Sequence, residues 1–324
     1  MKKLILIVII VLEILVLYKR NLMKVQVVAP PAQTAPTTPP PPQLLQTFPQ
    51  EALIHWMNYP KIHNTQFPIT GTLKDIEEHT VRGTSPKFTH NFKDLITWGH
   101  ETSHLISSKI SLSPKYYGLY VLKDKAIQIP WFGNPALTAK VAEAIPEKLR
   151  GHSYQLYLIK QGAKCESTLM LFDEWIAYTN GATIGKELNY PGWWYECLQA
   201  HQFNIYCIYV AKVVQEEYPE YNPEIMKDFM KWNIERTFGL LDDTKEVTNS
   251  KVLQDFPKCE ICPNYLVVKQ YNKRYGQENN FDSNPLKASK DYIEVFRSAT
   301  EAEPVRTFMK GYFGSDWCKE VYGF

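Results

Sequence analysis

Two histidines four positions apart, in a segment with helical spacing, constrain this chain more than any other feature of its sequence. The segment Thr97–Ile106 contains His100-Glu101-x-x-His104, and apolar or small residues recur every three or four positions around it, which predicts an α-helix. Residues at i and i+4 lie on one face of a helix, so both imidazoles can bind a single Zn²⁺ ion. Glu101 would then point toward a metal-bound water, where a general base is needed.

A catalytic zinc site needs a third protein ligand and one open position. A His-x-x-Gly-x-x-His continuation does not follow His104, because the next residues are Leu-Ile-Ser-Ser-Lys-Ile-Ser. A second apolar segment with helical spacing, residues 169–178, contains two adjacent acids, Asp173 and Glu174. A carboxylate in such surroundings requires a partner, so this segment is the better source of the third ligand.

Together the two segments resemble the gluzincin family of zinc metallopeptidases. In that family the third ligand is a glutamate on a second helix, often written Glu-x-x-Ala, and residues 174–177, Glu-Trp-Ile-Ala, match this motif. The resemblance implies that Glu174 completes a zinc site with His100 and His104. The small alanine would allow the two helices to approach closely. The resemblance covers only these two short motifs and does not assign a branch of the family.

The chain departs from the family pattern one turn after the ligand glutamate. Many gluzincins have an acid there that hydrogen-bonds a zinc histidine, whereas this chain has Tyr178. Asp173 is the candidate for such support, since zinc-bound histidines usually donate their other ring N–H to a carboxylate or carbonyl. The developing oxyanion needs a donor as well. The side chains considered for that role, which the sequence does not rank, are Tyr178, His201, His152 and Tyr195.

The ligand set and the resemblance imply hydrolysis of peptide bonds by a zinc-activated water, with Glu101 as general base and a peptide or protein as substrate. A hairpin predicted over residues 117–129 would flank the cleft, and a peptide could add a strand to the sheet edge there. The alternative is a tethered binding or structural domain in which the metal motif is coincidental or no longer catalytic.

Residues 51–324 are predicted to form the metallopeptidase-like domain, in one lobe or two. The whole chain is 44% hydrophobic and 22% charged, which is sufficient for a folded core, and its formal net charge of +2 gives no nucleic-acid footprint. Helical spacing or bounded apolar stretches occur over residues 137–149, 153–161, 166–187, 194–217, 223–238 and 289–312. With one hairpin and few other strand signals, the predicted class is α+β, predominantly α-helical, like a gluzincin catalytic domain.

Residues 1–24 are predicted to be a signal sequence or a membrane anchor. An apolar run, residues 4–18, follows Met1-Lys2-Lys3 and precedes Lys19-Arg20. As a helix it would be about 22 Å long, short of the roughly 30 Å hydrocarbon core, and Glu13 lies within it. Because small residues suited to cleavage do not follow closely, we expect retention as an anchor with the later domain outside the cytosol, or secretion if the segment is cleaved.

Residues 25–50 are predicted to be a proline-rich linker. The stretch 29–49 carries no charge and many prolines, which is typical of a polyproline-II spacer and prevents it from packing a core. A ligand for proline-binding modules is the alternative.

Six cysteines form an even set. Cys197 and Cys207 lie in one predicted helix about 15 Å apart, too far for a disulfide with each other. Cys259-Glu-Ile-Cys262 fits a tight disulfide loop, half of a zinc knuckle or a redox pair. A structural disulfide is the preferred interpretation for a domain outside the cytosol.

Overall fold

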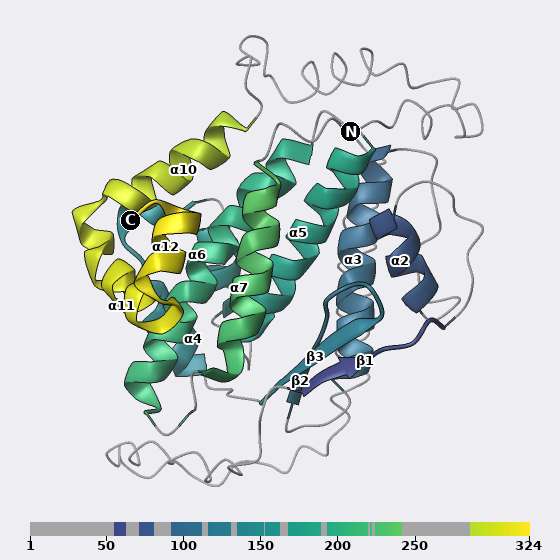
Figure 1. Cartoon of the computed structure of the whole chain (residues 1–324), viewed down its shortest axis with the longest axis horizontal. Coiled ribbons are helices and arrows are strands. Elements are labelled where there is room, and N and C mark those ends of the chain that lie inside the picture. The colour runs from purple at the N-terminus through teal and green to yellow at the C-terminus, as the bar shows by residue number, and fades with distance from the viewer. Residues whose placement is uncertain are drawn as a thin grey trace, which may run out of the picture. The chain divides into compact units, whose positions relative to one another are not determined.

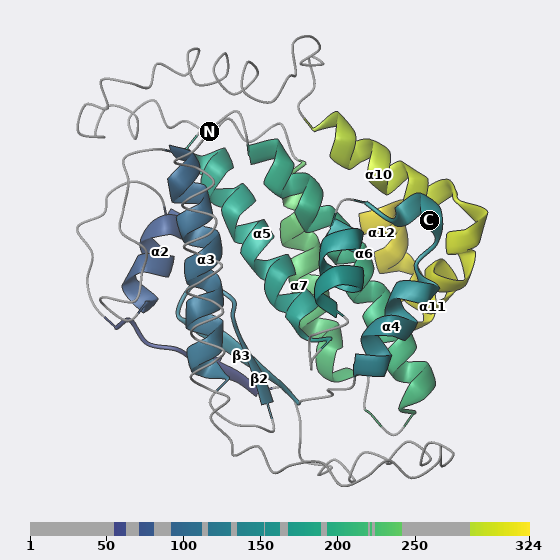
Figure 2. The same ribbon diagram turned by 180° about the vertical axis from the view of Figure 1, so that it is seen from behind.

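The computed structural model describes residues 55–62, 71–80, 92–111, 116–130, 135–151, 153–162, 168–188, 193–219, 221, 224–241 and 286–324. The chain divides into two compact units, Met1–Thr47 and Phe48–Phe324, and every described residue belongs to the second. This unit is mostly helical and has a small antiparallel sheet (Figure 1, Figure 2). The predicted class, α+β and predominantly α-helical, is therefore confirmed.

The segments predicted as membrane anchor and linker, residues 1–24 and 25–50, lie outside the described residues. Within the described ranges, none of the helices is both long enough and apolar enough to cross a bilayer. The anchor and the linker therefore stay predictions from the sequence.

Most of the described helices lie within or overlap the predicted helical segments. Tyr154–Gln161 form a π-helix, η2, and Glu147–Leu149 and Thr300–Ala302 form short 3₁₀ turns. The α-helices are α2 (Gly71–His79), α3 (Phe92–Ile110), α4 (Pro135–Ala144), α5 (Met170–Glu187), α6 (Trp193–Glu217), α7 (Glu224–Gly239), α10 (Lys287–Ser298), α11 (Glu303–Phe313) and α12 (Ser315–Tyr322). The histidine motif lies in the middle of α3.

Three helical predictions differ from the structure. The α-helix predicted over 137–149 ends at Ala144, shortly before Pro146, which lacks the N–H needed to continue it. The segment predicted over 153–161 winds as a π-helix. The helix predicted over 289–312 is two helices, α10 and α11, and a proline in the first turn of α11 favours a new start there. Helices α2 and α12 are short, and the periodicity did not identify them.

The sheet has three antiparallel strands in the order β1-β3-β2. The predicted hairpin is formed by β2, Tyr116–Tyr120, and β3, Lys125–Pro130, and β1, His55–Asn58, pairs with the other edge of β3. Leu119 pairs with Ile127, and both side chains are fully buried. Strand β1 was not predicted, since its residues are too few to show an alternation.

The turn between β2 and β3 has an unusual backbone. Residues 122–124 all have positive φ angles, 69°, 53° and 59°, a conformation that costs a non-glycine residue about 1–2 kcal/mol. Two contacts with α2 hold this turn. The backbone N–H of Lys123 donates to Oδ2 of Asp75 at 2.9 Å, and Nε2 of His79 lies 2.8 Å from Oδ1 of Asp124.

Helices α5 and α6 are buried on nearly all sides and lie at the centre of the largest hydrophobic cluster. A second cluster is formed mainly by α2, α3 and the sheet. Helix α5 contributes to both: Phe172 and Trp175 belong to the first, and Ile184 and Leu188 extend the second. The boundary between the two clusters therefore lies where α3 meets α5.

Small residues allow α3, α5 and α6 to approach closely. A Cβ atom at Gly99 of α3 would lie 2.2 Å from Cδ1 of Ile184 on α5. A Cβ atom at Gly185 of α5 would lie 2.9 Å from Cδ1 of Ile96 on α3 and 2.4 Å from Cβ of Trp193 on α6. The contact at Gly99 is with the end of the Ile184 side chain, which can move. The contact at Gly185 is with Cβ of Trp193, which cannot move, so this packing requires glycine at position 185.

Candidate metal centre

Helices α3 and α5 bring together the three side chains proposed as metal ligands. The Nε2 atoms of His100 and His104 are 3.2 Å apart, and each lies 3.6 Å from Oε2 of Glu174. The i, i+4 spacing on α3 places both imidazoles on one face, as the sequence indicates. Oε2 of Glu174 is buried and has no hydrogen-bond partner.

These residues fit a zinc ion. Bonds of about 2.0–2.1 Å at a tetrahedral angle separate two ligand atoms by about 3.3–3.4 Å, close to the 3.2 Å and 3.6 Å found here. A buried carboxylate oxygen without a hydrogen-bond partner is costly, and a divalent cation shared with the two imidazoles would satisfy it. Two histidines and one carboxylate are also a usual catalytic ligand set for Zn²⁺, leaving a fourth position for water or substrate.

Asp173, the residue before Glu174, fixes the orientation of His104. Nδ1 of His104 donates to Oδ2 of Asp173 at 2.8 Å, and the hydroxyl of Tyr117 on β2 lies 3.5 Å from the same oxygen. With the proton on Nδ1, the lone pair of Nε2 is directed at the cluster. A hydrogen bond between Asp173 and a histidine of the motif was anticipated from the sequence, whereas the contact between Tyr117 and Asp173 was not.

Charges at the site shift three pKa values in the metal-free protein. Burial lowers the pKa of His100, but the carboxylates of Glu174 and Glu196 outweigh it and raise the pKa to about 9. Burial also lowers the pKa of His104, but Asp173 and Glu174 outweigh this effect and raise the pKa well above its ordinary value. Burial raises the pKa of Glu174, but the two histidines outweigh it and lower the pKa to about 2. At neutral pH the histidine pair therefore holds protons that a metal must displace.

Tyr157 lies near the negative charges of Glu174 and Glu101 and was not singled out from the sequence. Burial raises the pKa of the Tyr157 hydroxyl, and the negative charges of Glu174 and Glu101 raise it further. Glu101 itself is exposed on α3. The hydroxyl of Tyr157 lies 2.9 Å from that of Tyr178. Tyr157 lies in the π-helix η2. This is the one local feature that indicates a functional role for Tyr157, since π-turns are frequent at functional sites.

Tyr178 and His201 have different surroundings. The ring of Tyr178 packs edge-on against His100, with centroids 4.5 Å apart, and stacks on Phe203. His201 is fully buried, and its Nδ1 lies 2.8 Å from the carbonyl oxygen of Cys197. Burial lowers the pKa of His201 to about 4. Tyr178 thus borders the metal ligands, whereas the contacts of His201 are with Cys197 and Phe238 instead.

The other two donor candidates are not brought to the ligands by any described contact. His152 lies outside the described residues. Tyr195 is exposed in the first turn of α6 and packs edge-on against Trp194.

The outer edge of β2 is already occupied by α3. The backbone N–H of Gly118 donates to Oγ of Ser111 at 2.7 Å, and the N–H of Tyr120 donates to Oγ of Ser107 at 3.2 Å. An added peptide strand would need these two donors. These two donors of β2 therefore already have partners within the chain, and the addition of a substrate strand to a sheet edge stays a prediction.

A second group of possible metal ligands, Asp75, His79 and Asp124, lies at the hairpin turn. Both ring nitrogens of His79 already have partners, because Nε2 contacts Asp124 and Nδ1 lies 2.5 Å from the carbonyl oxygen of Asp75 and 2.7 Å from the hydroxyl of Tyr120. We therefore interpret this group as the network that holds the strained turn.

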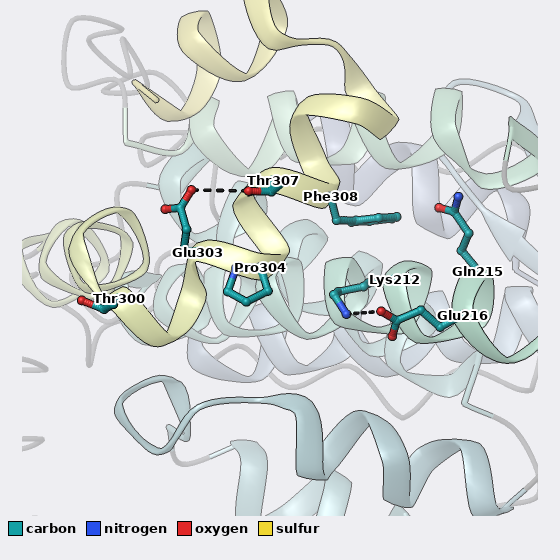
Figure 3. Close-up of a pocket in the computed structure, with 8 residues that line it drawn as sticks. All are labelled: Lys212, Gln215, Glu216, Thr300, Glu303, Pro304, Thr307 and Phe308. Carbon is teal, nitrogen blue, oxygen red and sulfur yellow. Dashed lines mark hydrogen bonds and ion pairs between the residues drawn. The ribbon is translucent and has the colours of Figure 1, made fainter.

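A groove of about 840 Å³ lies between α6 and α11, away from the candidate ligands (Figure 3). Lys212 and Glu216 form an ion pair on its α6 side, and Thr307 donates to Glu303 on its α11 side. The lining residues are Lys212, Gln215, Glu216, Thr300, Glu303, Pro304, Thr307 and Phe308. The groove contains none of the residues proposed for catalysis.

Among the described residues, Cys197, Cys207 and Cys318 are buried and form no disulfide with one another. Cys197 and Cys207 lie in α6, as predicted, and are not bonded to each other. Cys165, Cys259 and Cys262 lie outside the described residues, so the disulfide expected at Cys259 and Cys262 stays a prediction.

Comparison of the chain with protein-family models, with curated protein sequences and with solved structures gave no match. The interpretation of the site therefore rests on its own residues and geometry.

Proposed function

We propose that this chain is a membrane-anchored zinc-dependent metallopeptidase of gluzincin type, with Glu101 as general base. The observation that carries the proposal is the buried, unpartnered Oε2 of Glu174, 3.6 Å from Nε2 of both His100 and His104. Proteins rarely leave a buried carboxylate oxygen without a hydrogen bond, and a metal ion shared with the two imidazoles would satisfy this one. The anchor at residues 1–24 and a location outside the cytosol are part of the proposal and rest on the sequence alone.

Each residue near the three ligands has a distinct task in this proposal. A zinc ion bound there would act as a Lewis acid on the scissile carbonyl and lower the pKa of water toward 7. Glu101 would accept the proton of the attacking water and transfer it to the leaving amine. The hydroxyl of Tyr157 would donate a hydrogen bond to the developing oxyanion. Asp173 would keep the proton of His104 on Nδ1.

The exposure of Glu101 supports catalysis over a purely structural metal site. Structural zinc sites have four protein ligands and no open position, whereas the described residues supply three ligand atoms within 4.8 Å of one another. An ionisable side chain with access to solvent lies directly after the first of them. In this proposal a peptide substrate would reach Glu101 from the solvent side of α3.

The test compares the full-length chain with Glu101→Gln. We expect about one zinc per chain in both proteins, and hydrolysis of a mixture-based fluorogenic peptide library only by the wild type, with a loss of about 10²–10⁴-fold in the variant. Glu143→Gln changes an exposed glutamate on α4 and serves as the matched control. Equal hydrolysis by wild type and Glu101→Gln would overturn the general-base assignment. Bound zinc without any hydrolysis by the wild type would favour the tethered binding domain.

A further inference from the structure

We propose that Glu196 is the positioning residue for His100, and that this carboxylate from α6 takes the place of the acid that position 178 lacks. The inference rests on the proposed zinc function and adds a residue to it. Glu196 lies in the first turn of α6, and neither the histidine motif nor the Glu-x-x-Ala segment indicates it.

Glu196 approaches Nδ1 of His100 as Asp173 approaches Nδ1 of His104, but at a longer distance, as an ion pair and not as a short hydrogen bond. Oε2 of Glu196 lies 3.5 Å from Nδ1 of His100, and this buried oxygen has no hydrogen-bond partner among the described residues. Among the described residues, Nε2 of His100 faces the proposed ligand Glu174, and Nδ1 faces Glu196, which is not a proposed ligand. A proton held there directs the Nε2 lone pair of His100 toward Glu174 and His104.

Gly181 provides the space for this carboxylate. A Cβ atom at Gly181 would lie 2.9 Å from Oε2 of Glu196 and 3.6 Å from its Cδ. Glycine destabilises the interior of a helix such as α5 relative to alanine. If the Glu196 carboxylate must stay beside His100, then a larger residue at position 181 would displace it, which explains the glycine there.

Tyr178 cannot perform this role in the arrangement observed. Its ring packs edge-on against His100, and its hydroxyl lies 2.9 Å from the hydroxyl of Tyr157. The side chain one turn after Glu174 therefore presents a ring to His100. The carboxylate comes from the neighbouring helix α6, which α5 approaches closely at Gly185 and Trp193.

The test measures zinc affinity of the full-length chain by competition with a chromophoric chelator. Glu196→Gln should weaken zinc binding by about 10–100-fold, the usual effect of removing such a partner. The far-UV circular dichroism of the metal-free protein should be unchanged, since the amide preserves the shape of the side chain. Glu217→Gln, an exposed glutamate at the other end of α6, should leave zinc affinity unchanged.

A second variant separates positioning from general damage. Gly181→Ala should displace the carboxylate and weaken zinc binding to a similar extent, and the double variant Gly181→Ala/Glu196→Gln should bind zinc no more weakly than either single variant. Additive losses, or wild-type affinity in Glu196→Gln, would overturn the inference while leaving the zinc site intact. Absence of zinc binding by the wild type would instead overturn the proposed function, and with it this inference.

Discussion

Oδ2 of Asp173 lies 2.8 Å from Nδ1 of His104, so the residue beside the proposed ligand Glu174 orients a ligand on the opposite helix. Under the proposed function, one pair of adjacent acids on α5 would serve both tasks, with Asp173 on the imidazole and Glu174 on the metal. We expect Asp173→Asn to weaken zinc binding by about tenfold or more, because the neutral amide is a weaker acceptor. Asp228→Asn, at an exposed position of α7, is the control, and chelator competition is the measurement. Unchanged affinity in Asp173→Asn would contradict this assignment.

Tyr157→Phe is expected to reduce kcat/KM for peptide hydrolysis by about 10²–10³-fold, the effect of losing one oxyanion donor. Zinc affinity should stay at the wild-type level, because Tyr157 is not among the ligands. Tyr178→Phe, which removes the hydroxyl 2.9 Å away, should have a much smaller effect. Steady-state kinetics on one library-derived peptide provide the comparison, and equal losses in the two variants would argue against a specific role for Tyr157.

The stability of the metal-free protein should fall as the pH rises from 6.5 to 9. The pKa of His100 is raised to about 9 in the folded state, against about 6.5 when unfolded. Its stabilising contribution is therefore complete below pH 6.5 and is lost as the pH passes through 9. Thermal unfolding in the presence of a chelator measures this, and His100→Gln should diminish the difference between the two pH values. The prediction would be contradicted if the thermal midpoint were higher at pH 9 than at pH 6.5 and this difference were absent in His100→Gln.

Zinc should show the opposite dependence. Because protons on the histidine pair must leave before zinc binds, the rise in thermal midpoint on adding zinc should be larger at pH 9 than at pH 6.5. Calorimetry in two buffers of different ionisation enthalpy should detect release of at least one proton per zinc at pH 7. Binding without proton release would mean that the histidines are not the ligands.

Gly185→Ala should destabilise the protein by about 1–3 kcal/mol, as overpacking of a core does. The added Cβ would lie 2.4 Å from Cβ of Trp193, which is attached directly to the backbone of α6 and cannot rotate away. Gly311→Ala is the matched control, since nothing lies within 4 Å of its added Cβ on α11. That variant should be stabilised by about 0.5–1 kcal/mol. Denaturant unfolding compares the two, and destabilisation of both by the same amount would refute the packing argument.

The sequence could predict much of the site because its key spacings are local. His100 and His104 share a helix, and the i, i+4 rule places them together whatever the rest of the fold. Asp173 and Glu174 were recognisable as acids within an apolar segment that had to find a counter-charge.

Tyr157 and Glu196 could not be found in the same way. They reach the site from η2 and α6, and only the packing of these elements against α5 brings them near His100 and Glu174. The near-complete burial of α5 and α6 also removes the amphipathic pattern that would indicate which side faces the site. The irregular winding of η2 has no signature in residue spacing, so the segment was predicted as an ordinary helix.

The most direct test of the account is zinc K-edge X-ray absorption of the full-length chain loaded with one equivalent of zinc. The account predicts a first shell of nitrogen and oxygen only, at about 2.0–2.1 Å, with the outer scattering of two imidazoles, and loss of this shell in His100→Ala/His104→Ala. Sulfur at about 2.3 Å would assign the metal to cysteines such as Cys259 and Cys262. That result, or a spectrum unchanged in the double variant, would contradict a centre built from His100, His104 and Glu174.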